Sequence, residues 1–171
     1  MDMIPVNYSD ALFVAANMRE WDRKEIYATR WNDDPSDIAT DCCYMGDFGW
    51  VACEPEPIAV VGAGPMHPGV WGVHMFATDN FSKIAISLTK FVRRVIIPSL
   101  AATGAHRAEC KSMEGHEDAQ KWLEFLGAER ESTLAEYGRN GEDFHIYTWR
   151  KHNVFRRSQH PERQLRRDCA A

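Results

Sequence analysis

The chain has 171 residues, of which 44% are hydrophobic, and a formal net charge of −5 at pH 7. It is long enough for one well-buried core and too short to require two domains. No run of about eighteen apolar residues is present, and the segment Met1–Pro5 does not resemble a secretion signal. The five cysteines include no C-x-x-C pair, which argues against a metal site. We therefore expect a cytoplasmic protein without a membrane partner.

The charge is unevenly distributed. From Lys151 onward there are six Lys or Arg and two acidic residues, a net +4, which leaves −9 for the remainder. This pattern predicts one domain over residues 1–151 and a flexible basic tail over 152–171. Clustered arginines favour nucleic acid through counterion release. Phe155 is the one aromatic residue of the tail that could stack on bases, so we expect a solvated tail rather than nucleic-acid binding.

Patterns in the first half predict a strand, two helices and an antiparallel meander. Ile4–Val6 has strand character, and Ser9 and Asp10 are capping residues ahead of an apolar run. A charged helical stretch follows at Trp21–Tyr27, and turn-forming residues occupy 32–35. Three strand-like segments separated by Pro and Gly come next, at Phe48–Cys53, Ile58–Val61 and Val70–Phe76.

The second half predicts helices that alternate with strands. Apolar residues recur with helical spacing over Ser82–Ile97, and we expect Pro98 to end that helix. Ala105–Lys111 alternates as a half-exposed strand does. The remaining elements are a helix at Gly115–Leu126, closed by Gly127, and strands at Glu129–Leu134 and Phe144–Trp149 that flank the turn residues Asn140 and Gly141.

The resulting order is strand, two helices, three strands, helix, strand, helix and two strands. This order is similar to that of the GNAT superfamily of N-acetyltransferases. The resemblance implies an α/β fold with a mixed, mainly antiparallel sheet flanked by helices. It also implies that acetyl-CoA is the acyl donor, held between the fourth and fifth strands, here Val70–Phe76 and Ala105–Lys111.

The clearest local match lies in the last predicted helix. The family shows N-x-x-A-x-x-x-Y-x-x-x-G-F, and the segment 116–128 shares Ala119 and Gly127 with it. His116 stands in place of the asparagine, Leu123 in place of the tyrosine that protonates the departing thiolate, and Ala128 in place of the phenylalanine. The resemblance implies that His116 and Ala119 contact the cofactor, and that the usual general acid is missing.

A second family motif, R/Q-x-x-G-x-G/A, falls on residues 80–85, where Ala85 alone conforms. Small residues are favoured there because backbone N–H groups at a helix N-terminus must approach the phosphates closely. The resemblance places Lys83, Ile84 and Ala85 at the pyrophosphate, with the Lys83 ammonium either paired with a phosphate or solvated. It assigns the main chain of Met75, Phe76 and Ala77 to the thioester carbonyl and the pantetheine arm.

Acetyl transfer also needs a route for the amine proton. His74 is the first candidate for the base, because histidine titrates near neutral pH and this one lies on the fourth strand. A strand histidine is also commonly a packing residue. Glu20 and Glu25 are alternative carboxylates, although a charged helix face accounts for both. Tyr137 and Tyr147 are candidate acids, and nothing in the sequence brings either one to the thiolate.

The stretch Ala16–Ile26 resembles the L-R-x-x-D-x-x-E-I segment of GNAT-like proteins encoded by tailed bacteriophages, some of which are internal virion proteins. Two hypotheses follow. The first is an N-acetyltransferase that acts on a small-molecule or protein amine. The second is a catalytically reduced GNAT scaffold that works through contacts with other virion proteins, in the host cytoplasm or in the particle. A fold alone does not decide between them.

Overall fold

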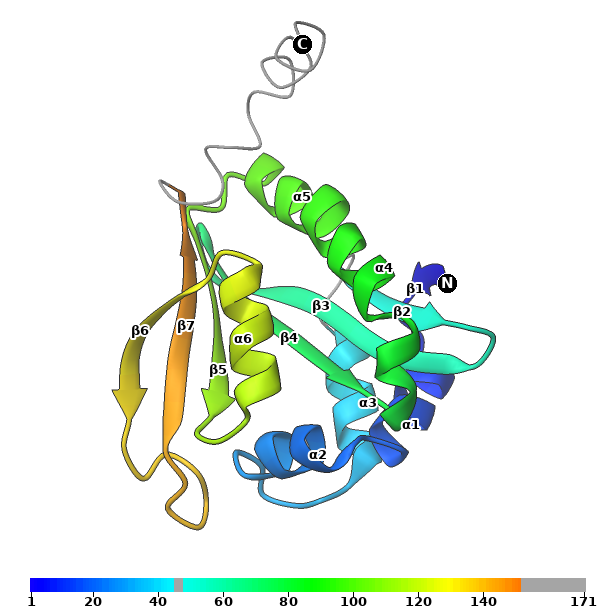
Figure 1. The fold of residues 1–171 in the computed structure, drawn as a ribbon, viewed down its shortest axis with the longest axis horizontal. Helices are drawn as coiled ribbons and strands as arrows, with labels where there is room; N and C mark the ends of the chain where they lie inside the picture. Colours follow the sequence, from blue (N-terminus) through cyan, green and yellow to red (C-terminus); the bar gives the residue numbers. More distant parts are fainter. Residues whose placement is uncertain (45–47, 152–171) are drawn as a thin grey trace, which may run out of the picture.

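The computed structural model describes residues 1–44 and 48–151, so the predicted tail at 152–171 lies outside the described residues. One sheet runs through the molecule in the order β1-β2-β3-β4-β5-β7-β6 (Figure 1). Only the β4–β5 pair is parallel among the strand pairs of the described chain. The strands are β1 (Asp2–Pro5), β2 (Gly49–Cys53), β3 (Pro57–His67), β4 (Val70–Ala77), β5 (Arg107–Met113), β6 (Glu129–Leu134) and β7 (Phe144–Arg150).

Helices cover both faces of the sheet, as Figure 1 shows. The helical elements are α1 (Tyr8–Ala16), α2 (Glu20–Tyr27), α3 (Pro35–Tyr44), η1 (Asp79–Lys83), α4 (Ala85–Phe91), η2 (Val92–Ile96), α5 (Ile97–Ala102) and α6 (Glu117–Phe125). One apolar cluster joins α4, α5 and α6 to the sheet, and a second joins α1 and α3 to the other face. The predicted mixed, mainly antiparallel sheet flanked by helices is confirmed. No helix in the described ranges is long and apolar enough to cross a membrane.

Two features near the N-terminus differ from the sequence prediction. Helix α1 is capped by Asn7, whose side chain accepts a hydrogen bond from the N–H of Asp10, so the cap precedes Ser9. A further helix, α3, follows the predicted loop and buries Ile38, Ala39 and Cys42 against the second cluster. Its start does carry a signal, because Asp34 accepts a hydrogen bond from the N–H of Ser36 and Pro35 is the first helical residue.

The prediction that Pro98 ends the long helix is wrong. Proline has no N–H, and its ring crowds the carbonyl four residues earlier. Here the preceding turn, η2, is a π-helix in which the N–H of Ile97 bonds to the C=O of Val92. The wider turn accommodates the proline. The chain therefore stays helical to Ala102, as α5.

Candidate active site between the splayed strands

The parallel strands β4 and β5 pair over three residues and then separate. Their register joins Val70–Gly72 to Arg107–Glu109, whereas β4 runs on to Ala77 and β5 to Met113. A cavity of about 540 Å³ lies at this opening and is lined by both strands together with α2, η2, α5 and α6. The splay therefore creates an interior space with strand backbone on both sides.

The unpaired edge of β4 faces this space. The N–H of Thr78 donates to the C=O of Ile58 on β3. At Ala77 the direction is opposite, because its N–H donates to Asp22 and its C=O accepts from the N–H of Arg19. Backbone groups alternate in direction along a strand. Met75, the first residue of this orientation beyond the stretch paired with β5, therefore directs its N–H and C=O groups into the opening, where an extended ligand can bond as an added strand would.

The two sides of the cavity differ in chemistry. Cys110 packs with the apolar cluster under α4–α6, and burial raises the pKa of its thiol. Alternation along β5 therefore puts Glu109 and Lys111 on the opposite face, the one covered by α1 and α3. The apolar side is lined by Val92, Ile96, Leu100, Ala119, Trp122 and Leu123, and the polar side by Glu25, Thr29, His74, Glu109, Lys111 and Tyr137.

His74 lies on the polar side of the cavity. It shares a face of β4 with Phe76, which packs in the α1–α3 cluster. Burial lowers the pKa of His74 to about 4, so the imidazole is neutral at pH 7. Its ring lies against Gly62 of β3, where an added Cβ would come within 2.7 Å of the ring Cε1. A neutral histidine can accept a hydrogen bond from an amine and is a weak base.

The two glutamates of α2 that the sequence singled out point in different directions. Glu20 pairs with Lys24 on the outer surface, its side chain 68% exposed, and is absent from the lining of the cavity. Glu25 lines the cavity and its side chain is 18% exposed. Of these two glutamates, the fold therefore brings Glu25 to the site.

Four charged or ionisable residues connect α2 to the tips of both splayed strands, and we call them the clasp: Arg19, Asp22, Glu25 and His116. Asp22 accepts hydrogen bonds from the N–H of Ala77 at 2.7 Å and from Nε of Arg19 at 2.8 Å. Glu25 Oε2 accepts from the N–H of Met113 at 2.7 Å and from the hydroxyl of Ser112 at 2.9 Å. His116 lies between the two carboxylates, with Nδ1 3.0 Å from Glu25 and Nε2 3.5 Å from Asp22.

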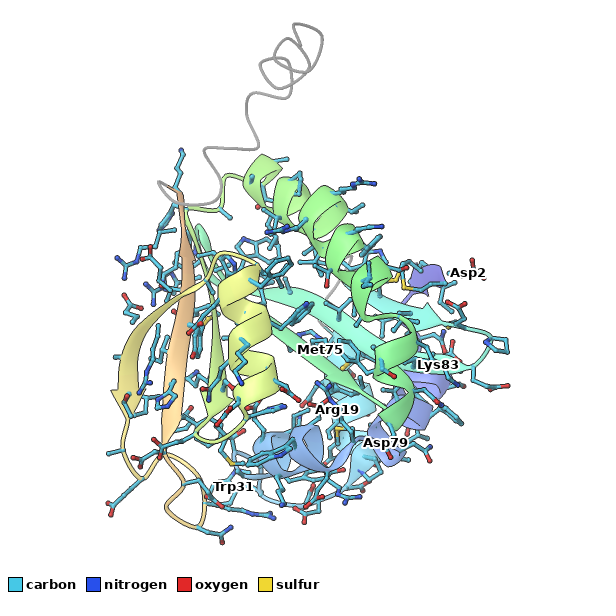
Figure 2. All side chains as sticks on the ribbon, viewed as in Figure 1. Asp2, Arg19, Trp31, Met75, Asp79 and Lys83 are labelled. Carbon is cyan, nitrogen blue, oxygen red and sulfur yellow. The ribbon has the colours of Figure 1, made fainter. Side chains whose placement is uncertain are left out.

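The segment assigned to the pyrophosphate has a different form from the family's glycine-rich turn. Its amides are already bonded within η1, because Thr78 accepts from the N–H groups of Asn80 and Phe81, and Phe81 accepts from that of Ile84. Ile84 is fully buried and Ala85 begins α4. Lys83 is exposed at the end of η1, whose first turn carries Asp79, and Figure 2 shows both near the N-terminal end of α4.

The remaining sequence candidates are split between the cavity and the core. Ala119 and Leu123 of α6 line the cavity, as does Tyr137 of the β6–β7 connection. Tyr147 is buried in the cluster under α6 and is not among the lining residues. Glu109 and Lys111 also line the cavity and were not among the sequence candidates. A signal was available, because residues two apart on the predicted strand Ala105–Lys111 lie on the same face of the sheet.

Comparison with known proteins identifies the fold. No family model and no curated protein matches the chain. Similar solved structures include an N-acetyltransferase from Staphylococcus aureus Mu50 (TM-score 0.69, 12% identity, 87% of this chain and 97% of that one). They also include a ribosomal-protein-alanine N-acetyltransferase from Brucella melitensis (TM-score 0.67, 15% identity, 88% and 99%). A third, yncA from Salmonella typhimurium, was solved with its cofactor acetyl-CoA (TM-score 0.66, 12% identity, 88% and 93%). The chain therefore has the fold of GNAT-family acetyltransferases, and identities this low establish the fold alone.

Proposed function

We propose that this protein is an N-acetyltransferase that transfers an acetyl group from acetyl-CoA to an amine. The observation that carries the proposal is the unpaired edge of β4 at Met75 beside a cavity of about 540 Å³. Backbone donors fixed at such an edge stabilise the negative charge that develops on a thioester oxygen during acyl transfer. Figure 2 labels Met75 in the space between α6 and α4, the side from which the donor would enter.

The site fits one half of acetyl-CoA better than the other. An acylated pantetheine arm matches the open β4 edge and the apolar lining contributed by Ala119 and Leu123. The nucleotide half has less to bind, because the amides of η1 are bonded internally and Asp79 repels phosphate. Lys83 is the cation nearest in sequence to the start of α4. We infer a donor site that gains most of its affinity from the arm.

The acceptor amine would approach from the polar side, where Glu25 and His74 line the cavity. The Glu25 carboxyl group orients the amine by accepting hydrogen bonds from its N–H groups. The neutral imidazole of His74 offers a second acceptor. Attack of the amine nitrogen on the acyl carbon forms the amide, breaks the carbon–sulfur bond and releases a proton from nitrogen. With Leu123 at the usual position of the acid, the thiolate is protonated by solvent or by Tyr137.

The proposal is tested by incubating the protein with acetyl-CoA and a panel of primary amines, with release of the CoA thiol as the readout. The expected result is amine-dependent release that Glu25→Gln reduces by about tenfold or more, as loss of a charge-assisted contact predicts. Glu20→Gln is the matched control on the outer face of α2 and should leave the rate unchanged. A rate equal to the protein-free reaction for every amine would reject the proposal.

The internal bonding of η1 favours one alternative, a GNAT scaffold that has lost donor binding and acts through protein contacts. The likeness to phage-encoded proteins belongs to this alternative and rests on the sequence 16–26. It predicts that acetyl-CoA produces no thermal stabilisation at millimolar concentration. Stabilisation that rises with ligand concentration would reject it.

A further inference from the structure

The spacing of the phage-like motif has a structural consequence. Arg19, Asp22 and Glu25 follow one another at intervals of three residues, so they lie along one face of the chain entering and forming α2. That face turns inward, since Asp22 is 3% exposed. The partners of these carboxylates are Ala77 at the tip of β4 and Met113 at the tip of β5. Helix α2 therefore joins the two strands where their own pairing has ended.

His116 lies at the centre of this arrangement. It is the N-cap residue of α6, is 3% exposed, and its ring stacks on Trp21 at a centroid distance of 5.6 Å. Its two ring nitrogens face carboxylate oxygens on opposite sides. The contact between Nδ1 and Glu25 is a hydrogen bond, and Nε2 lies 3.5 Å from Asp22.

Glu25 gains a fixed orientation from these contacts. Within the described chain, its three hydrogen bonds all fall on Oε2, from Ser112, Met113 and His116. A carboxylate has two oxygens and about four lone-pair sites. Because Glu25 lines the cavity, its Oε1 is the oxygen left to contact a ligand there.

We propose that His116 is a positioning residue: held between Asp22 and Glu25, it fixes α2 across the splayed strand tips and orients Oε1 of Glu25 to bind an alkylammonium group. The identity of Glu25 as the acceptor-side carboxylate rests on the proposed function. The contact by which His116 orients Glu25 does not, since it belongs to the geometry of the clasp. The ligand class is an alkylammonium ion, the protonated form of a primary amine.

The first test is nitrogen NMR of the imidazole rings in the full-length protein. The charged groups that face His116 are Asp22 and Glu25 from α2, with Arg19 behind Asp22. We expect the Nδ1 resonance of His116 to move in Glu25→Gln, because Nδ1 lies 3.0 Å from Oε2 of Glu25, and the resonances of His145 to stay in place. His145 is the internal reference, because it is equally buried and contacts the Thr133 hydroxyl through Nδ1, with Glu114 3.9 Å from its Nε2. A His116 Nδ1 resonance that is the same in wild type and in folded Glu25→Gln would overturn the proposal.

The second test measures binding of n-butylammonium by NMR titration in wild-type protein, Glu25→Gln, His116→Asn and His145→Asn. We expect the dissociation constant to rise by about tenfold in the first two variants, the effect of one charge-assisted hydrogen bond, and to be unchanged in His145→Asn. Asp22→Asn serves as a second probe of the clasp if His116→Asn does not fold, and should weaken binding in the same direction. Unchanged affinity in the folded clasp variants would overturn the proposal.

The two proposals fail in different ways. If acetyl-CoA does not bind while n-butylammonium binding requires both Glu25 and His116, the transferase assignment falls and the clasp stands. If acetyl-CoA binds and amines are acetylated while n-butylammonium affinity is the same in wild type and His116→Asn, the clasp is rejected and the transferase stands.

Discussion

The carboxylate of Asp22 accepts a hydrogen bond of 2.7 Å from the backbone N–H of Ala77, which lies 55 residues further along the chain. A side chain thus satisfies a donor at the strand tip that a neighbouring strand would satisfy in a continuous sheet. The contact leaves the backbone of the preceding outward-facing residue of β4, Met75, open toward the cavity. Asp22 therefore satisfies the last outward-facing N–H of β4, and the unpaired edge of the strand begins at the residues before Ala77.

Replacing Asp22 with alanine should destabilise the fold strongly. The substitution leaves the N–H of Ala77 without its acceptor and leaves Arg19 facing His116 without the anion between them. Removing one partner from a buried charged network costs about 3–5 kcal/mol. Urea denaturation followed by circular dichroism measures the change. Glu20→Gln on the exposed face of the same helix is the control, and an equal loss in both variants would contradict the account.

Stability should fall in acid partly through His74. Its pKa is lowered from 6.5 to about 4 by burial, so between these values the unfolded chain binds a proton that the folded protein excludes. The free energy of unfolding contributed by this residue is therefore complete above pH 6.5 and is lost as the pH falls toward 4. The loss is about 2 kcal/mol, reduced from the full shift by residual solvent contact.

The measurement is a comparison of wild type with His74→Gln in urea titrations from pH 7 to pH 4. Glutamine does not titrate in this range. As the pH falls from 7 to 4, the free energy of unfolding of wild type should therefore drop by about 2 kcal/mol more than that of His74→Gln. Parallel curves over the whole range would show that His74 is not held neutral by the fold.

Gly62→Ala should destabilise the sheet by about 1–3 kcal/mol, the usual effect of overpacking. The new Cβ would lie 2.7 Å from the His74 ring and 2.8 Å from the backbone oxygen of Phe48. Gly72→Ala on the neighbouring strand is the matched control, since its nearest contact is Met66 at 3.5 Å. Thermal unfolding should separate the two variants, and equal midpoints would contradict the packing described at Gly62.

Filling the cavity from α6 should weaken donor binding without unfolding the protein. Ala119 lines the cavity, whereas Ala101 of α5 is also a half-buried helical alanine and does not. We expect Ala119→Leu to weaken binding of acetyl-CoA by about tenfold or more, and Ala101→Leu to leave it within about twofold. Isothermal titration calorimetry provides both constants. Equal affinities would mean that the donor does not enter this cavity.

The phosphates of acetyl-CoA should contribute little to its affinity. The amides of η1 are bonded to Thr78 and Phe81, which leaves Lys83 as an exposed cation. Surface ion pairs contribute about 0–1 kcal/mol. The dissociation constant of S-acetylpantetheine should therefore lie within about fivefold of that of acetyl-CoA. In Lys83→Glu the two dissociation constants should be closer still. A preference for acetyl-CoA of a hundredfold or more would show that η1 rearranges to bind phosphate.

Much of the fold could be predicted from local patterns. Period-two and helical spacing located the strands of the meander and α6, and their order led to the GNAT fold. Helix α3 was missed because its buried residues Ile38, Ala39 and Cys42 form a short stripe within a polar stretch. The continuation of the helix past Pro98 depends on a π turn, for which the apolar spacing of the segment gives no signal.

The candidate site was harder to predict, because it is made by long-range contacts. The bond between His116 and Glu25 spans 91 residues and depends on how β4 and β5 separate. Helical spacing could have selected Glu25 over Glu20. Residues three apart on a helix share a face and residues two apart do not, and Glu25 lies three residues after the buried Asp22 whereas Glu20 lies two before it. The roles assigned to His74, Lys83 and Ala119 in transfer stay predictions.

The central claim is that acetyl-CoA binds in the opening between β4 and β5, and calorimetric titration of the full chain with acetyl-CoA tests it most directly. We predict saturable one-to-one binding that S-acetylpantetheine competes for and that Ala119→Leu weakens. Absence of heat and of thermal stabilisation at millimolar acetyl-CoA, in protein shown to be folded, would contradict the account.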